Sequence, residues 1–184
     1  MSKKEAILDA ALKLFTENGV RATSTKSIAS EANTSEALIF KHYGTKDYLL
    51  ETIIKKAYQT AAVETNLYLK GLSESAYINS MIELPIHLTR SNPVFWRMQY
   101  KIMPLNPISS RYHENFMRPC QLRLTECFGA LRYSNPAMEA ELLLIHIDGI
   151  WKYFAAHQPD DSLKKELIEL MKQKYRFKGA ATEN

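Results

Sequence analysis

Apolar residues recur along this chain at helical spacing, with polar residues between them. Within residues 3–18 they fall every three or four positions and so share one face of a helix, which Gly19 ends. Ser24 then suits the cap of a short helix over 25–32, and Ser35 suits the cap of a second one. The first part of the chain is therefore predicted as one longer and two short helices.

The rest of the chain continues this helical pattern. A long helix is expected from 46 to about 69, after a capping Thr45. No segment shows the sustained alternation of a strand, so the chain is predicted to be all-α, with about nine helices. The remaining helices are expected over 74–91, 93–103, 110–131, 136–157 and 161–176.

Prolines mark some of these helices. Asn92 and Asn135 each precede a proline, and a capping residue before proline at the first helical position is a strong start signal. Pro85 and Pro119 fall inside predicted helices, which they are expected to kink or break because proline lacks the amide hydrogen.

The composition is that of an ordinary globular protein, with 46% hydrophobic and 24% charged residues. The formal net charge is +4. Residues 1–56 carry nine Lys and Arg against seven Asp and Glu, so half of this excess lies there and half in the remainder. The net charge therefore does not indicate a nucleic-acid partner. Whether the chain binds nucleic acid has to be judged from where particular charged residues lie.

Neither a membrane nor a metal partner is expected. The N-terminus has no apolar signal segment, and no apolar run approaches the roughly 20 residues of a membrane span, which favours a cytoplasmic protein. Cys120 and Cys127 are the only cysteines and suit free thiols in a core. With His113 they form a seven-residue ladder, but seven helical residues rise about 10 Å, too far for one ion. No cofactor is predicted.

Two short helices joined by a tight turn and supported by a first helix have the layout of a helix-turn-helix domain, whose second short helix enters the major groove of DNA. That helix begins with the small or polar Ser35, Glu36 and Ala37, which suit base edges. It ends with Lys41 and His42, which suit phosphates. Three-helix arrangements also occur in many unrelated proteins.

Within about residues 5–55 the chain carries an ordered set of residues: Ile7, Leu8, Ala11, Leu14, Phe15, Gly19, Thr23, Ser24, Thr25, Ile28, Ala29, Ala32, Ser35, Leu38, Phe40, His42, Tyr43, Lys46, Leu49 and Leu50. In order and spacing this set closely resembles the DNA-binding domain of TetR-family transcriptional regulators. Two departures are Phe40, where the family has tyrosine, and Asn33, where it has a turn glycine. The resemblance implies a helix-turn-helix domain over 1–46, joined by the long helix to a ligand-binding and dimerisation domain over 47–184.

The resemblance also implies roles for single residues. Thr25 and Lys26 are expected to face phosphates, Glu36 and Ala37 to lie nearest the base edges, and Tyr43 to belong to the core. The full set expected at DNA is Thr25, Lys26, Ser35, Glu36, Ala37, Phe40, Lys41, His42 and Lys46.

Lys46 raises a question of its own, because it stands at the start of the long helix. A helix N-terminus carries partial positive charge and disfavours a cation unless an anion lies beside it. Our hypothesis is that this anion is a DNA phosphate. The alternative is a lysine that extends into water while Asp47 satisfies the helix dipole.

The last two helices suggest a dimer. Residues 142–151 are apolar on nearly all sides, so this helix must be covered on more than one face, and residues 161–176 carry an apolar stripe. A four-helix contact between two copies is expected, with burial inside a monomer as the alternative. The predicted interface residues are Leu143, Ile147, Ile150, Leu163, Leu167, Leu170 and Met171.

Both tryptophans and most Tyr and Met residues lie beyond residue 56. Such side chains suit a pocket for a small, largely apolar or aromatic ligand, and they suit an ordinary core equally well. The candidates for the pocket are Met81, His87, Phe95, Trp96, Gln99, Tyr100, Phe116, Cys120 and Trp151.

Taken together, these features favour a transcriptional regulator that acts as a dimeric repressor. Its expected partners are a palindromic double-stranded DNA operator, a second copy and a small-molecule effector that releases it. An activator, or a regulator without a ligand, fits the same pattern. An enzyme is not expected, since the phosphate-binding and dinucleotide-binding glycine patterns and the His-Glu-x-x-His motif are absent. The alternative from another class is a helical scaffold or adaptor without DNA binding.

Overall fold

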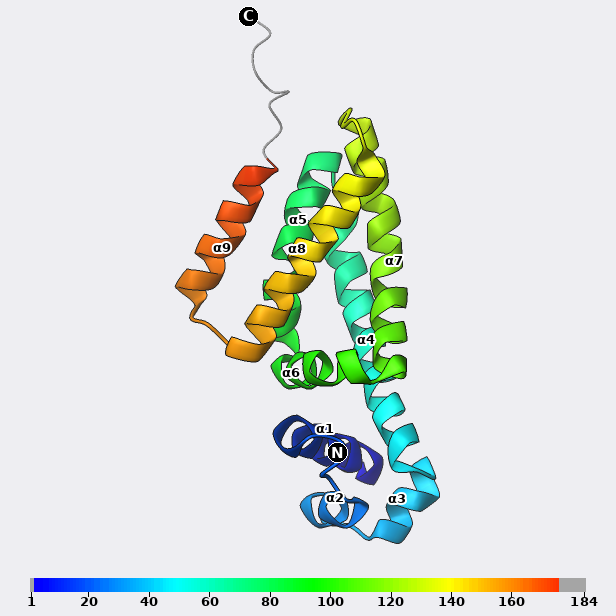
Figure 1. The fold of residues 1–184 in the computed structure, drawn as a ribbon. Coiled ribbons are helices and arrows are strands. Elements are labelled where there is room, and N and C mark those ends of the chain that lie inside the picture. Colours follow the sequence, from blue (N-terminus) through cyan, green and yellow to red (C-terminus); the bar gives the residue numbers. More distant parts are fainter. Residues whose placement is uncertain (1, 176–184) are drawn as a thin grey trace, which may run out of the picture. The chain divides into compact units, whose positions relative to one another are not determined.

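The computed structural model describes residues 2–175, and within them the chain forms nine α-helices, one 3-10 turn and no strand (Figure 1). The prediction of an all-α chain with about nine helices is confirmed. Residue 176, the expected end of the last helix, lies outside the described residues. The elements are α1 Lys3–Asn18, α2 Thr25–Glu31, α3 Glu36–Tyr43, α4 Lys46–Leu69, α5 Glu74–Ser91, α6 Pro93–Ile102, η1 Met103–Leu105, α7 Pro107–Ala130, α8 Pro136–His157 and α9 Asp161–Lys174.

The expected caps fix several helix starts. The side-chain oxygen of Asn92 accepts the Phe95 N–H at 3.1 Å, and Asn135 caps α8 in the same way. The Thr45 hydroxyl oxygen accepts the Tyr48 N–H at 3.0 Å. Each bond satisfies a donor that the first turn of a helix leaves without an intrahelical partner.

The two internal prolines do not break their helices. α5 continues through Pro85 and α7 through Pro119, so of the two expected outcomes, a kink or a break, the break does not occur. Around Pro85 the neighbouring Leu84 and Leu88 are fully buried. Each such burial contributes about 1.5–3 kcal/mol, which offsets much of the cost of the lost hydrogen bond.

The chain packs as two compact units, of which the first consists of Met1–Ala62 and Asn92–Phe116. Its α6 packs against α1. The Lys101 ammonium donates to the Thr16 carbonyl oxygen at 2.7 Å, and the Thr16 hydroxyl lies 3.4 Å from the carbonyl oxygen of Val94. These bonds attach α6 to the helix that supports α2 and α3.

The second unit consists of Val63–Ser91 and Met117–Asn184. Within its described residues α5 is central, because both α8 and α9 pack against it (Figure 1). Met81, Phe128 and Trp151 are fully buried there. The expected functional division at residue 46 remains a prediction, because packing groups residues 47–62 and 92–116 with the N-terminal helices.

No helix within residues 2–175 has both the length and the apolarity needed to span a bilayer.

Candidate nucleic-acid interface

The two short helices and their turn are held by local side chains. Ser24 and Ser35 cap α2 and α3, and their hydroxyl oxygens accept the N–H groups of Ser27 at 3.0 Å and Leu38 at 3.3 Å. Asn33 lies in the turn with φ +47°, in the left-handed region that asparagine tolerates. The expected helix-turn-helix geometry is confirmed.

One face of α3 belongs to the core of the first unit. Ile39 is 1% exposed and Tyr43 is buried, with its hydroxyl donating to the Lys4 carbonyl oxygen at 3.0 Å. Burial also raises the pKa of the Tyr43 phenol. The prediction that Tyr43 packs inward is therefore confirmed.

The opposite face of α3 is open. Phe40 is 49% exposed, although a ring of this size usually packs inside a protein. None of the nine residues predicted at DNA is buried, and their contact with DNA remains a prediction. The exposed ones are Lys26, Ser35, Ala37, Phe40 and Lys41, and the half-buried ones are Thr25, Glu36, His42 and Lys46.

Thr25 and Glu36 form a pair that the sequence analysis missed. The Thr25 hydroxyl donates to a carboxylate oxygen of Glu36 at 2.6 Å. A hydroxyl carries one hydrogen, so in this arrangement Thr25 cannot also donate it to a phosphate. A threonine that opens one helix and an acidic residue that opens the next are visible in the sequence, but only the angle between the helices brings them together.

Lys46 is tied to the loop between α1 and α2. Its ammonium donates to the carbonyl oxygens of Val20 at 2.8 Å and Thr23 at 2.9 Å. The alternative of a lysine extending into water is therefore wrong, since two backbone oxygens partner its charge. An ammonium has three N–H groups, so one remains for a further acceptor, and a DNA phosphate in that place stays a prediction.

Two further residues beside the helix-turn-helix were missed. The Lys3 ammonium donates to the carbonyl oxygen of Asn33 at 3.0 Å, which ties the start of α1 to the turn. Tyr48, in the first turn of α4, is 56% exposed. Its position off the apolar stripe formed by Leu49 and Ile53 was the signal in the sequence.

Residues 7–53 match the family described as bacterial regulatory proteins, tetR family. The matched segment is therefore similar to the N-terminal DNA-binding segment of the TetR family. The chain is 48% identical over 50 residues to YvkB of Bacillus subtilis, named an uncharacterized HTH-type transcriptional regulator. It is 45% identical over 49 residues to Rv3405c of Mycobacterium tuberculosis, named an HTH-type transcriptional repressor. Each match covers 27% of this chain and only 26% of the relative.

Solved structures extend the TetR-family likeness to the whole fold. A putative tetR family transcription regulator from Shewanella sp. PV-4 aligns over 95% of this chain and 96% of its own, with a TM-score of 0.75 and 17% identity. A putative transcriptional regulator from Saccharomonospora viridis, solved in complex with choline, aligns over 93% and 92%, with a TM-score of 0.70 and 19% identity. At these identities the likeness concerns the fold alone.

The nine residues predicted to line an effector pocket are divided between the units. Met81, His87, Cys120 and Trp151 belong to the second unit, where His87 is exposed and the other three are buried. The first unit holds Phe95, Trp96, Gln99, Tyr100 and Phe116, all buried except the half-buried Phe116. Their role in a TetR-type effector pocket remains a prediction.

The predicted dimer residues need a correction. Leu143 and Ile147 are fully buried and Met171 is 6% exposed, so these three pack inside the second unit. Apolar residues occur on nearly all sides of α8, so the sequence pattern could not distinguish its inner face from its outer face. The large hydrophobic residues exposed on α8 and α9 are Met138, Leu142, Ile145, Tyr153, Leu163 and Leu170, while Ile150 and Leu167 are half-buried.

Proposed function

We propose that this chain is a sequence-specific DNA-binding transcriptional regulator in which α3 enters the major groove. The observation that carries the proposal is the open face of α3, with Ala37, Phe40 and Lys41 exposed on a helix whose other face is buried. Small and apolar groups suit base edges and thymine methyl groups, and the lysine suits phosphate. Lys26 adds a cation at the start of α2.

We further propose that the regulator is a homodimer acting on a palindromic operator. Two copies of α3 would then lie about one DNA turn apart, roughly 34–36 Å. Leu142 and Ile145 on α8 are 48% and 60% exposed, and Leu170 on α9 is 53% exposed. Water-exposed apolar side chains at helical spacing favour burial against a second copy.

Repression with release by a small molecule is the mode we propose. It is supported by the relative named a repressor and by the choline complex of a protein with this fold. A regulator of this kind acts where the chromosome is, in the cytoplasm. A scaffold without DNA binding is less favoured, because it would not account for the solvent-exposed Phe40 between Ala37 and Lys41.

The test is a fluorescence anisotropy titration of the full chain at near-physiological salt. One labelled duplex comes from the region upstream of the protein's own gene, and the other has the same bases shuffled. Preferential binding of the native duplex by at least a hundredfold is expected, since specific sites typically exceed non-specific ones by about 10³ or more. If no genomic fragment is bound at any salt concentration, the regulator proposal is wrong and the scaffold alternative gains support.

A further inference from the structure

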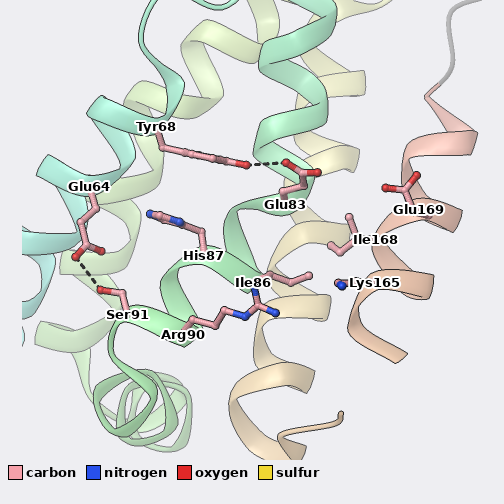
Figure 2. A pocket seen from close by; sticks show the side chains of 10 residues that line it. All are labelled: Glu64, Tyr68, Glu83, Ile86, His87, Arg90, Ser91, Lys165, Ile168 and Glu169. Atoms are coloured by element: carbon pink, nitrogen blue, oxygen red, sulfur yellow. Dashed lines mark hydrogen bonds between the residues drawn. The ribbon is translucent and has the colours of Figure 1, made fainter. Parts of the chain in front are cut away.

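A crevice with a volume of about 650 Å³ opens in the second unit between α4, α5 and α9. Figure 2 shows side chains from all three helices around it. Its lining combines apolar and ring surface with five charged side chains, which are Glu64, Glu83, Arg90, Lys165 and Glu169. Its volume lies in the range of small-molecule sites.

One wall of the crevice is a fixed pair of rings. Tyr68 and His87 stack with centroids 4.8 Å apart and ring planes 8° from parallel. The Tyr68 hydroxyl donates to Glu83 at 2.6 Å, and burial together with this bond raises the pKa of Tyr68 to about 12. The phenol therefore stays protonated and holds its ring, while His87 is exposed and offers a flat surface to a ligand.

Three of the five charged side chains already have ion-pair partners. The Glu169 carboxylate lies 3.1 Å from the Lys172 ammonium. The Glu83 carboxylate pairs with the Lys172 ammonium, and the Arg90 guanidinium pairs with Asp161 at 2.9 Å. Burial alone would raise the pKa of Glu83, but the bonds from Lys172 and Tyr68 lower it below its usual value. Glu83 and Arg90 therefore each have an ion-pair partner without a ligand, although Glu83 shares Lys172 with Glu169.

Glu64 and Lys165 differ from these pairs. A carboxylate oxygen of Glu64 accepts a 2.7 Å hydrogen bond from the neutral Ser91 hydroxyl, and neither Glu64 nor Lys165 forms an ion pair within residues 2–175. Figure 2 shows them on different walls, with side chains of α5 between them. Among the charged residues of the crevice, Glu64 and Lys165 are thus the carboxylate and the ammonium without an ion-pair partner in the described part of the chain, and the two stacked rings lie beside them.

We propose that this crevice binds a zwitterionic small molecule with its charges at opposite ends of a planar or apolar body. Its ammonium group pairs with Glu64, its carboxylate pairs with Lys165, and its body lies against His87. Charge pairing at both ends selects against a ligand that carries only one charge. The ligand class differs from the largely apolar one that the sequence suggested. An effector role for this ligand rests on the proposed regulatory function, whereas binding itself does not.

The test uses three probes that share one ring and differ only in charge. 4-(Aminomethyl)benzoate carries both charges, benzylamine has only the ammonium, and 4-methylbenzoate has only the carboxylate. Dissociation constants for the full chain are measured by NMR titration. The zwitterion is expected to bind about fivefold more tightly than either singly charged probe, as for one partly exposed ion pair. Equal affinities for all three would overturn the proposal.

Two variants test whether Glu64 binds the ammonium group of the ligand and Lys165 binds its carboxylate. Glu64→Gln should weaken the binding of 4-(aminomethyl)benzoate and of benzylamine about fivefold, and it should leave the affinity for 4-methylbenzoate unchanged. Lys165→Gln should weaken the binding of 4-(aminomethyl)benzoate and of 4-methylbenzoate, and it should leave the affinity for benzylamine unchanged. Lys174→Gln is the matched control, since Lys174 is exposed on the same helix and does not line the crevice. Zwitterion binding that survives both crevice variants would place the ligand elsewhere and contradict the proposal.

Operator binding by the same samples separates the two proposals. If the chain binds the operator but does not prefer the zwitterionic probe over the singly charged ones, the proposed ligand site is wrong and the proposed regulatory function is still supported. A charge-dependent preference without DNA binding would support the site and count against the regulator. If both are observed, addition of 4-(aminomethyl)benzoate to the operator complex tests the effector role directly.

Discussion

The hydroxyl of Thr25 donates a 2.6 Å hydrogen bond to the carboxylate of Glu36, which links the first residue of α2 to the first residue of α3. The carboxylate thereby lies at a helix N-terminus, where negative charge is favoured. The bond holds Glu36 in one position at the start of the helix that we propose to read DNA. We therefore predict that Thr25 positions Glu36 and does not donate its hydroxyl to a phosphate.

This relationship predicts that Thr25 and Glu36 act as a unit in base selection. Thr25→Val should release the carboxylate and weaken discrimination at the base pair it reads by about 1–3 kcal/mol, while affinity for shuffled DNA stays nearly constant. Glu36→Ala should abolish the same discrimination, and adding Thr25→Val to it should change nothing further. Competition anisotropy with single-base operator variants measures this. Additive effects of the two substitutions would show that the bond does not govern readout.

Lys46 is predicted to serve both stability and DNA binding. Lys46→Met removes charge-assisted bonds to Val20 and Thr23, which should lower the free energy of unfolding by roughly 1.5–3 kcal/mol. It should also reduce the slope of log affinity against log salt by about one, as for one phosphate contact. Urea titration and salt-dependent anisotropy measure the two effects.

The control for Lys46 is Lys41→Met, because Lys41 is exposed on α3 and forms no ion pair within residues 2–175. It should reduce the salt slope by a similar amount without changing stability. A Lys46 variant that loses stability while keeping its salt slope would restrict Lys46 to a structural role.

Features that depend on residues close together in the sequence could be predicted, whereas features that depend on tertiary contacts could not. The start of α1 at Lys3 and that of α4 at Lys46 follow from caps and apolar spacing, which are local. The sequence left a kink or a break open at Pro85, and α5 continues there because tertiary burial of the neighbouring Leu84 and Leu88 offsets much of the local loss. The Thr25–Glu36 bond depends on how two helices cross, and sequence spacing does not contain that angle.

The same limit applies to the other sites. Leu143 and Leu142 are adjacent and chemically identical, yet one is fully buried and the other is 48% exposed. On a helix that is apolar on nearly all sides, only the position of α5 decides which residue faces inward. The crevice is lined by α4, α5 and α9, and of its ten lining residues only His87 was among the predicted pocket residues.

The outer face of α8 is predicted to carry the dimer contact. Ile145→Glu places a charge where the second copy should pack and is expected to give a monomer at micromolar concentration, because a buried unpaired charge costs several kcal/mol. Leu122→Glu on α7 is the control, since Leu122 is 61% exposed and Ile145 is 60% exposed. Sedimentation velocity measures the outcome. A dimeric Ile145→Glu variant would mean that the contact lies elsewhere.

Gln99 is predicted to stabilise the first unit through its hydrogen bonds. Although fully buried, it donates to the Tyr58 hydroxyl at 2.8 Å and to the Ser109 carbonyl oxygen at 3.2 Å, and its amide oxygen accepts the Ser109 hydroxyl at 2.8 Å. Gln99→Met keeps the volume but leaves the Ser109 groups short of partners, which should cost about 2–4 kcal/mol of unfolding free energy. Gln173→Met, at an exposed position of α9, should cost less than about 0.5 kcal/mol. Urea titration followed by circular dichroism compares the two, and a Gln99 variant as stable as its control would mean that this network does not hold the unit together.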